Sequence, residues 1–244
     1  MMRNSMLVAR RELGGYFATP VGAVFTVIFL VLQGVLTFNL GSFFARGQAD
    51  LVPFFNFLPW VLLLLVPAIT MRLWAEERRS GTIELLLTLP ITDTQAVVGK
   101  FLAAWGFCIL ALVLTFPFVI TVNLLGAPDN GVIGASYIGA VLVAGTYLAI
   151  GGALSAVTRN QVIAFVLAIA VCFFFAAAGL QVVTDFLSSQ APGLAEAARR
   201  IGVLERFQSF LRGVIDARDL IYFASMIGFW LFVTVLVVEA RKTD

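Results

Sequence analysis

A compact cluster of charged residues occupies one stretch, Trp74–Lys100, which lies between two long apolar runs. Before Pro90 and after it, this stretch carries charges of both signs: Glu76, Glu77, Arg78, Arg79, Glu84, Asp93 and Lys100. Only 12% of all residues are charged. A cluster of this kind at a membrane face is an orientation signal, a docking surface for another protein, or both. We expect both functions here.

Catalytic chemistry is disfavoured by the residue types that the sequence lacks. It contains no histidine, which excludes His-based zinc sites, Ser-His triads and His proton relays. The Gly99-Lys100 pair lacks the upstream glycine and the following Ser or Thr of a P-loop. No Asp or Glu is expected inside a predicted span, which disfavours paired-aspartate proteolysis and ion-coupled transport. We therefore predict no catalytic, metal or cofactor-binding residue in this chain, and an energy source outside the bilayer.

Composition defines the class of protein. Hydrophobic residues make up 61% of the chain, 23 residues are Phe, and the mean hydropathy is +1.00. Apolar runs of about 20 residues recur and cannot be hidden in a water-soluble core. The net charge of +2 is scattered over loop ends, so nucleic-acid binding is not expected. The sequence predicts an all-α polytopic membrane protein with a single transmembrane domain over residues 1–244, and the lipid bilayer as its surroundings.

Six membrane spans are predicted, each long enough to cross about 30 Å of hydrocarbon. The Lys and Arg count gives their orientation, with ten on the side of the N-terminus and six on the other, five of these six in one long loop. Both termini are therefore expected in the cytoplasm. The predicted spans are residues 21–43, 53–73, 97–125, 132–157, 161–181 and 219–239.

Three segments outside the spans are predicted to be helical. Residues 1–19 place Met6, Ala9, Leu13, Tyr16 and Phe17 at helical spacing, which indicates an interfacial helix. In the cytoplasmic segment 74–92, Ser80 and Gly81 break the helix that continues from the second span, and Thr82–Leu89 forms a short amphipathic helix that Pro90 ends. Thr92 and Gln95 match a capping box opening the third span. The outer segment 182–218 contains an amphipathic helix beyond Pro192 and Gly193, with a break at Gly202 or Gly213.

Polar and small residues within the spans favour packing functions. Small residues at four-residue spacing along the fourth span predict that it lies inside the bundle. Most of the polar residues at membrane depth are expected to bond between helices or to lie near the interfaces, and lining of a substrate path is the less favoured alternative: Gln33, Asn39, Asn56, Thr70, Thr115, Asn123, Thr146 and Ser155.

The run AEERRSGTIELLLTLPITDTQAVVGKF resembles the coupling-helix region of type-2 ABC exporter permeases. The closest likeness is to the branch of gliding-motility-associated permeases and the permease of nitrous oxide reductase maturation. RRELGGYFATPVGAVF is similar to that family's N-terminal connecting helix and first span, and TRNQ to its loop between the fourth and fifth spans. ERFQSFLRGVIDARDLIYF is similar to the same branch's last outer segment.

The resemblance implies a permease in the bacterial cytoplasmic (inner) membrane that pairs with a second copy or a paralogue. It also implies a separate P-loop ATPase subunit, which would carry ATP and Mg. The residues that the resemblance assigns to ATPase docking are Glu76, Glu77, Arg78, Arg79, Ser80, Gly81, Thr82, Glu84 and Leu85. A membrane-anchored extracytoplasmic partner, or a lid, would involve Arg206, Ser209, Arg212, Gly213, Asp216 and Asp219.

Two alternatives remain open on the sequence alone. The charged residues at 76–79 are equally well explained as an ordinary positive-inside anchor whose acids and bases pair along the surface. The whole chain also fits a membrane anchor or scaffold that holds an outer partner and moves no cargo.

Overall fold

The computed structural model describes residues 2–18, 20–80 and 92–240, and the regular structure within them is helical. The elements in chain order are α1 (Met2–Ala18), α2 (Pro20–Val35), the π-helix η1 (Leu36–Leu40), α3 (Val52–Thr70), α4 (Ala75–Ser80), α6 (Asp93–Val113), α7 (Phe116–Leu125), α8 (Asn130–Val157), α9 (Gln161–Ala177), α10 (Gln181–Gln190), α11 (Pro192–Ile201), α12 (Val203–Leu211) and α13 (Ala217–Ala240).

The chain is an all-α polytopic membrane protein, as predicted. Within the described residues, five helical stretches are long and apolar enough to cross a membrane: Gly22–Leu40, Val52–Arg79, Asp93–Leu125, Asn130–Val157 and Ala217–Ala240. The remaining predicted span corresponds to α9, which has 17 residues and bends by 72° into α10. Its length of about 25 Å lies at the lower limit for a membrane crossing.

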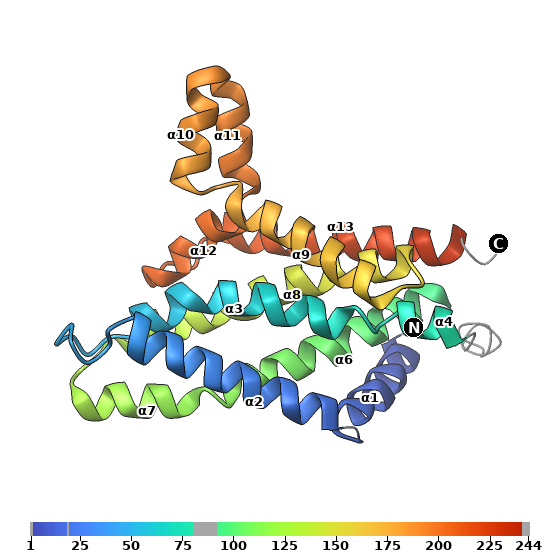
Figure 1. Cartoon of the computed structure of the whole chain (residues 1–244), viewed down its shortest axis with the longest axis horizontal. Helices are drawn as coiled ribbons and strands as arrows, with labels where there is room; N and C mark the ends of the chain where they lie inside the picture. Colours follow the sequence, from blue (N-terminus) through green and yellow to red (C-terminus); the bar gives the residue numbers. More distant parts are fainter. Residues whose placement is uncertain (1, 19, 81–91, 241–244) are drawn as a thin grey trace.

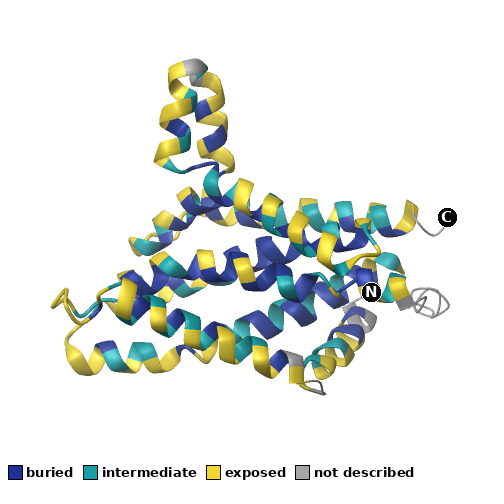
Figure 2. Cartoon of the chain, viewed as in Figure 1, coloured by how far each residue is buried: buried dark blue, intermediate teal, exposed yellow. Residues whose placement is uncertain are grey.

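The long helix α8 forms the centre of the bundle and packs against α3, α6, α9, α12 and α13. Its small residues allow these close contacts. A Cβ added at Gly151 would lie 2.1 Å from Oγ1 of Thr70, and one at Gly139 would lie 2.8 Å from the side chain of Phe210. Figure 2 shows the buried residues concentrated along α8 and α3. The prediction that the fourth span lies inside the bundle is confirmed.

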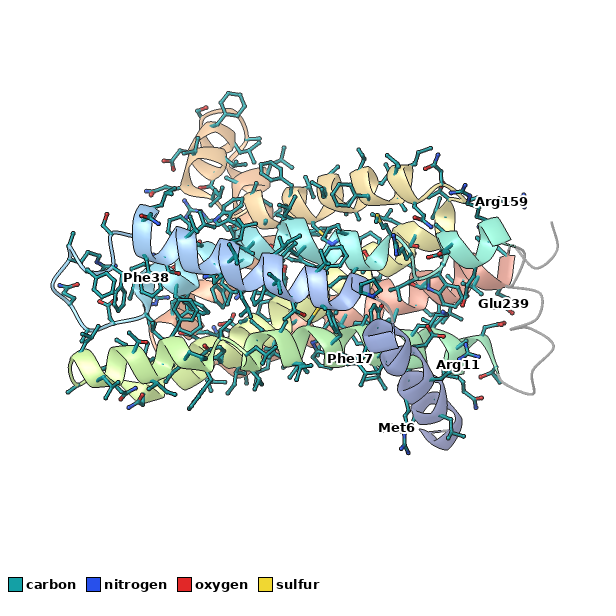
Figure 3. All side chains as sticks on the ribbon, turned by 60° about the horizontal axis from the view of Figure 1, so that its bottom comes forward. Met6, Arg11, Phe17, Phe38, Arg159 and Glu239 are labelled. Carbon is teal, nitrogen blue, oxygen red and sulfur yellow. The ribbon has the colours of Figure 1, made fainter. Side chains whose placement is uncertain are left out.

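The described ends of the chain, Met2 and Ala240, lie at the same end of the bundle (Figure 1). We call this the terminal end, and the other the opposite end. Helix α1 crosses the terminal end at an angle to the spans; Arg159 and Glu239 lie at the same end, whereas Phe38 lies at the opposite end (Figure 3). In α1, Ala9 is buried and Tyr16 packs against the core, but Met6 and Phe17 are exposed. The predicted apolar stripe of α1 is therefore divided between the bundle and the surroundings.

The third predicted span is broken where α6 ends and α7 begins. Pro117 has no N–H to continue the helical hydrogen bonding of α6. The hydroxyl of Thr115 lies 2.6 Å from the carbonyl oxygen of Leu112 and 2.7 Å from the hydroxyl of Tyr137 on α8. Two other polar residues predicted at membrane depth also bond between helices, because Gln33 donates to the carbonyl of Phe54 and Ser155 bonds to the segment after α3.

The connection before the last span consists of α10, α11 and α12. Gly202 separates α11 from α12, which confirms one of the two predicted break positions; Gly213, with φ of +76°, follows α12. Helix α10 was not predicted. The hairpin of α10 and α11 projects sideways from the bundle (Figure 1), and it joins the bundle at Gly179 and Gly202. These glycines are in contact, since a Cβ on Gly202 would lie 2.6 Å from Cα of Gly179.

Candidate functional site

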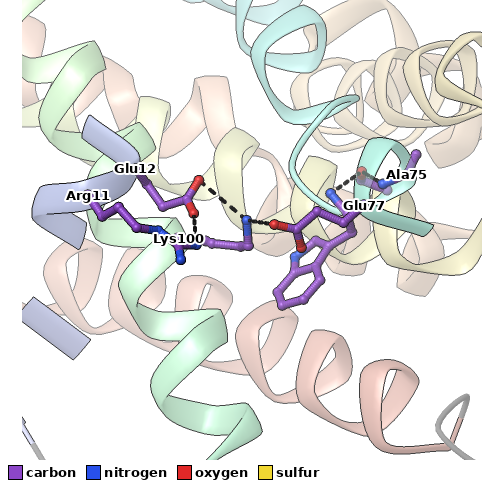
Figure 4. Close-up of polar contacts among 7 residues, drawn as sticks. Arg11, Glu12, Ala75, Glu77 and Lys100 are labelled. Atoms are coloured by element: carbon purple, nitrogen blue, oxygen red, sulfur yellow. Dashed lines mark hydrogen bonds and ion pairs between the residues drawn. The ribbon is translucent and has the colours of Figure 1, made fainter. Parts of the chain in front are cut away.

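Lys100 of α6 is a buried cation at the terminal end of the bundle, and its side chain is 3% exposed. Its ammonium lies 2.7 Å from Oε1 of Glu77 on α4 and 3.4 Å from Oε2 of Glu12 on α1 (Figure 4). The ring of Trp74 lies 5.5 Å from the same nitrogen. We call Glu12, Trp74, Glu77 and Lys100 the lysine junction. It joins the N-terminal helix, the charged segment and the third span.

The start of α6 is set by the capping box that the sequence predicted. The backbone N–H of Gln95 donates to Oγ1 of Thr92 at 3.3 Å, and the backbone N–H of Thr92 donates to Oε1 of Gln95 at 3.2 Å. These bonds satisfy N–H groups that a helix N-terminus otherwise leaves without partners. Because the first residue of α6 is defined in this way, Lys100 is placed about two turns into the helix.

Helix α1 reaches the lysine junction because Gly99 leaves room for it. A Cβ on Gly99 would lie 2.7 Å from Cβ of Val8 and 2.9 Å from the carbonyl oxygen of Ser5. Further along α6, the rings of Tyr16 and Phe107 stack with their centroids 5.1 Å apart. Contacts at both places hold α1 along α6.

Glu12 is ionised more readily than an ordinary glutamate. Burial alone would favour the neutral acid, but the Lys100 ammonium and the Arg11 guanidinium lower the pKa of the Glu12 carboxyl below its usual value of 4.5. Arg11 contributes a hydrogen bond of 2.8 Å from Nη2 to Oε1. The lysine junction therefore places one cation between two acidic side chains.

A single hydroxyl forms hydrogen bonds with the backbone groups at the break between α3 and α4. Oγ of Ser155, on the buried face of α8, accepts hydrogen bonds from the backbone N–H groups of Trp74 and Ala75 and donates to the carbonyl of Met71, each at 3.2 Å. These backbone groups are left without helical partners at the break. Ser155 thus attaches the start of α4 to the central helix.

The residues assigned to ATPase docking fall into two groups. Glu76 and Arg79 are exposed on α4, whereas Glu77 and Arg78 are half-buried, and Glu77 faces Lys100 (Figure 4). Ser80 is the last residue of α4. The helix continuing from the second span is already broken at Met71–Trp74, earlier than the predicted break at Ser80 and Gly81. Gly81, Thr82, Glu84 and Leu85, and the helix predicted over Thr82–Leu89, lie outside the described residues.

Two of the residues assigned to an outer partner or lid, Arg206 and Asp219, form an ion pair with each other. Nη1 of Arg206 on α12 lies 3.2 Å from Oδ1 of Asp219 on α13, and the guanidinium lies 5.5 Å from the Tyr222 ring. Asp216 accepts a bond from the backbone N–H of Arg218 at the start of α13. Arg212, Gly213 and Asp216 are exposed, and Ser209 is half-buried.

One sequence-based expectation is wrong at Asp219. No Asp or Glu was expected inside a span, yet α13 contains Glu239 near its end and Asp219 in its first turn, and Asp219 is 3% exposed. Two features stabilise the charge there: the first turn of a helix favours an acidic side chain, and Arg206 supplies a counter-ion.

Sequence reasoning did not assign Lys100, Glu12 or Ser155 to the site. A signal existed for Lys100, because a lysine two turns inside an apolar span needs an acidic partner. Its two partners come from segments 23 and 88 residues away, and spacing along one helix cannot identify such partners. Among the described residues no three His, Cys, Asp or Glu side chains gather as metal ligands.

The fold and the lysine junction define a multi-pass membrane protein with a charged segment tied to its N-terminal helix. Residues 37–212 match the family model described as ABC-2 family transporter protein. This match covers more than half of the chain, which therefore belongs to the ABC-2 transporter family. Proteins of this family are membrane permease components of ABC transporters, are not themselves catalytic, and function with an ABC ATPase. No curated protein matches the sequence at a significant level.

Proposed function

We propose that this chain is the permease subunit of an ATP-driven exporter and that movement of its ATPase reaches the membrane helices through Lys100. The observation that carries the proposal is the lysine junction. Glu77 lies on α4, within the segment assigned to ATPase docking, and its partner Lys100 belongs to a membrane-spanning helix.

The mechanism follows from this connectivity. A pull on the segment after α4 displaces Glu77, and the buried ion pair transfers the force to α6 and, through Glu12, to α1. Separating a buried charge from its partner is costly, so the three helices move together more readily than apart. An ATPase shifts the permease between two states only if it contacts them differently. The docking segment is where we place those contacts.

We also propose a location and an assembly for this permease. We place the terminal end in the cytoplasm of a bacterial inner membrane, which the distribution of Lys and Arg supports. A second copy or a paralogue completes the permease. The branch of gliding-motility-associated and nitrous-oxide-reductase-maturation permeases is supported by the quoted sequence likenesses.

Affinity purification tests the ATPase partnership. The tagged chain is extracted in mild detergent from cells that also express its genomic neighbours, and the co-purifying proteins are identified. We expect a stoichiometric P-loop ATPase that is lost from Glu84→Lys and weakened in Arg79→Glu. Arg212→Glu, at the opposite end, is the matched control and should retain it. A well-folded chain recovered alone, or an ATPase retained by both docking variants, would contradict the proposal.

The alternative function, a scaffold for an extracytoplasmic partner, is favoured by one observation. The hairpin of α10 and α11 projects from the bundle (Figure 1) and exposes Val182, Phe186 and Leu194. The two functions differ in the ATPase rate. In an exporter this rate should change when cargo binds, whereas in a scaffold it need not. An ATPase rate that no cargo changes, together with capture of an outer protein through the hairpin, would support the scaffold.

A further inference from the structure

A cavity of about 400 Å³ opens at the opposite end of the bundle, beneath the point where the α10–α11 hairpin joins it. Its walls come from three places: the first two turns of α3, the junction of α9 with α10, and α12. The lining is about half polar, unlike the entirely apolar groove of similar size beside Trp105 on α6. A mixed lining of this kind is typical of a site for a ligand with both characters.

Four polar side chains line the cavity: Asn56, Gln181, Glu205 and Gln208. All four are exposed, and within the described parts of the chain none of these side chains has a hydrogen-bond or ion-pair partner. Asn56 differs in this from two other polar residues predicted at membrane depth, since Gln33 bonds to Phe54 and Ser155 to Met71. The cavity therefore holds a set of polar groups that the fold itself does not use.

Apolar side chains contribute to all three walls, including Phe55 and Trp60 on α3 and Phe207 on α12. Phe55 and Phe207 are each 2% exposed and form a fixed wall, whereas Trp60 is 37% exposed. A ring exposed beside polar side chains can cover an alkyl chain or the apolar face of a sugar. Phe55 and Trp60 follow each other along α3 toward the membrane centre, so the apolar lining continues in the direction of the hydrocarbon.

We propose that this cavity binds an amphiphile whose head group supplies hydroxyl or ammonium donors. Glu205 lies in the first turn of α12, and an ionised carboxylate can only accept hydrogen bonds. The amides of Asn56, Gln181 and Gln208 can accept or donate. An anionic head group would meet the carboxylate and is disfavoured. The apolar part of the amphiphile lies against Phe55 and Trp60. That the amphiphile is the cargo of the exporter rests on the proposed function. That the cavity binds the amphiphile does not.

Binding is measured on the purified chain in amphipol by calorimetric titration with three probes of equal chain length: decyl glucoside, decylamine and decyl sulfate. We expect saturable binding of the glucoside or the amine, about tenfold or more tighter than the sulfate, since one charge-assisted bond contributes about 1.5–3 kcal/mol. Asn56→Leu combined with Gln208→Leu should weaken both favoured probes about tenfold. Equal affinities for all three probes, unchanged in the variants, would show simple partitioning and overturn the proposal.

Glu205→Gln distinguishes the two donor types. It should weaken the amine about tenfold and the glucoside much less, because an amide oxygen still accepts a hydroxyl. Glu196→Gln, on the exposed face of α11, is the matched control and should leave both affinities unchanged. If Glu205→Gln leaves both affinities unchanged and instead lowers the dimer fraction in light scattering, a second copy covers the cavity and the proposal is wrong.

The cargo assignment has a separate readout. Saturable binding that raises the ATPase rate of the assembled transporter supports cargo, and the rise should disappear in the Asn56→Leu and Gln208→Leu double variant. Saturable binding without any change in that rate supports the site and contradicts the cargo assignment. If no ATPase co-purifies, the proposed function fails, and the titration still decides the binding site.

Discussion

The ammonium of Lys100 lies 2.7 Å from Oε1 of Glu77, and this pair joins a membrane-spanning helix to the charged segment that follows α3. The same ammonium lies 3.4 Å from Glu12 on α1. Each acidic side chain is about one-fifth exposed, whereas the lysine is almost fully buried. The cation is therefore the member of the lysine junction that depends most on its partners.

Removing this cation should destabilise the protein. In Lys100→Met the stem volume is retained, but Glu12 and Glu77 lose the buried ammonium that lies between them, and we expect a loss of about 3 kcal/mol in unfolding free energy. The change in unfolding free energy is measured by unfolding the protein in mixed micelles of rising SDS fraction. Arg159→Met, an exposed cation at the same end, should change little. Adding Glu77→Gln to Lys100→Met should recover part of the loss; a double variant less stable than Lys100→Met would contradict the ion pair.

The contribution of Glu12 should depend on pH. Because the pKa of its carboxyl is lowered below 4.5 in the folded protein, its stabilisation is complete above that value and is lost as the pH falls through the lowered pKa. Wild-type protein and Glu12→Gln should therefore differ in unfolding free energy at neutral pH and converge in acid. Glu239→Gln, an exposed carboxylate at the same end, is the control. A difference independent of pH would show that Glu12 acts through packing alone.

The approach of α1 to α6 should depend on the missing side chain at Gly99. Gly99→Ala places a Cβ 2.7 Å from Val8, so α1 must shift, at a cost of about 1–3 kcal/mol. Gly106→Ala, on the same helix with open space around its Cβ position, should be neutral or stabilising by up to about 1 kcal/mol. Protease cleavage after Arg10 and Arg11 reports release of α1 directly. Equal cleavage in the two variants would contradict the close contact.

Ser155 should contribute more to the free energy of unfolding than an ordinary serine of a membrane helix. Ser155→Ala leaves the N–H groups of Trp74 and Ala75 without their acceptor, and we expect a loss of about 2 kcal/mol with weaker coupling of ATP hydrolysis to transport. Ser225→Ala removes an exposed hydroxyl that bonds within its own helix and should cost little. Hydrogen exchange at Trp74 and Ala75 should accelerate in Ser155→Ala only, and unchanged exchange would exclude the capping function.

Much of the fold follows from local signals in the sequence. The apolar runs predict the spans because each must cross the same thickness of hydrocarbon. The capping box at Thr92 and Gln95 and the break at Gly202 also depend on neighbouring residues alone, and the structure confirms both.

The features that were missed depend on contacts between distant segments. The break at Met71–Trp74 occurs earlier than Ser80 and Gly81 indicate, because Ser155 supplies hydrogen bonds from 81 and 80 residues away. Asp219 is buried because Arg206, on another helix, pairs with it. Likewise, the four polar residues of the cavity at the opposite end come from three separate segments, and nothing in their spacing along the chain predicts that they converge.

The hairpin of α10 and α11 leaves and rejoins the bundle at one point, since Gly179 and Gly202 are in contact. An insert whose two ends touch spans no distance, so its length is not dictated by the helices that it connects. Residues 180–201 can therefore be extended, shortened or exchanged during evolution while α9 and α12 keep their positions. A lineage that retained these two glycines would gain a new external surface by altering one contiguous stretch, without redesigning the parts that cross the membrane.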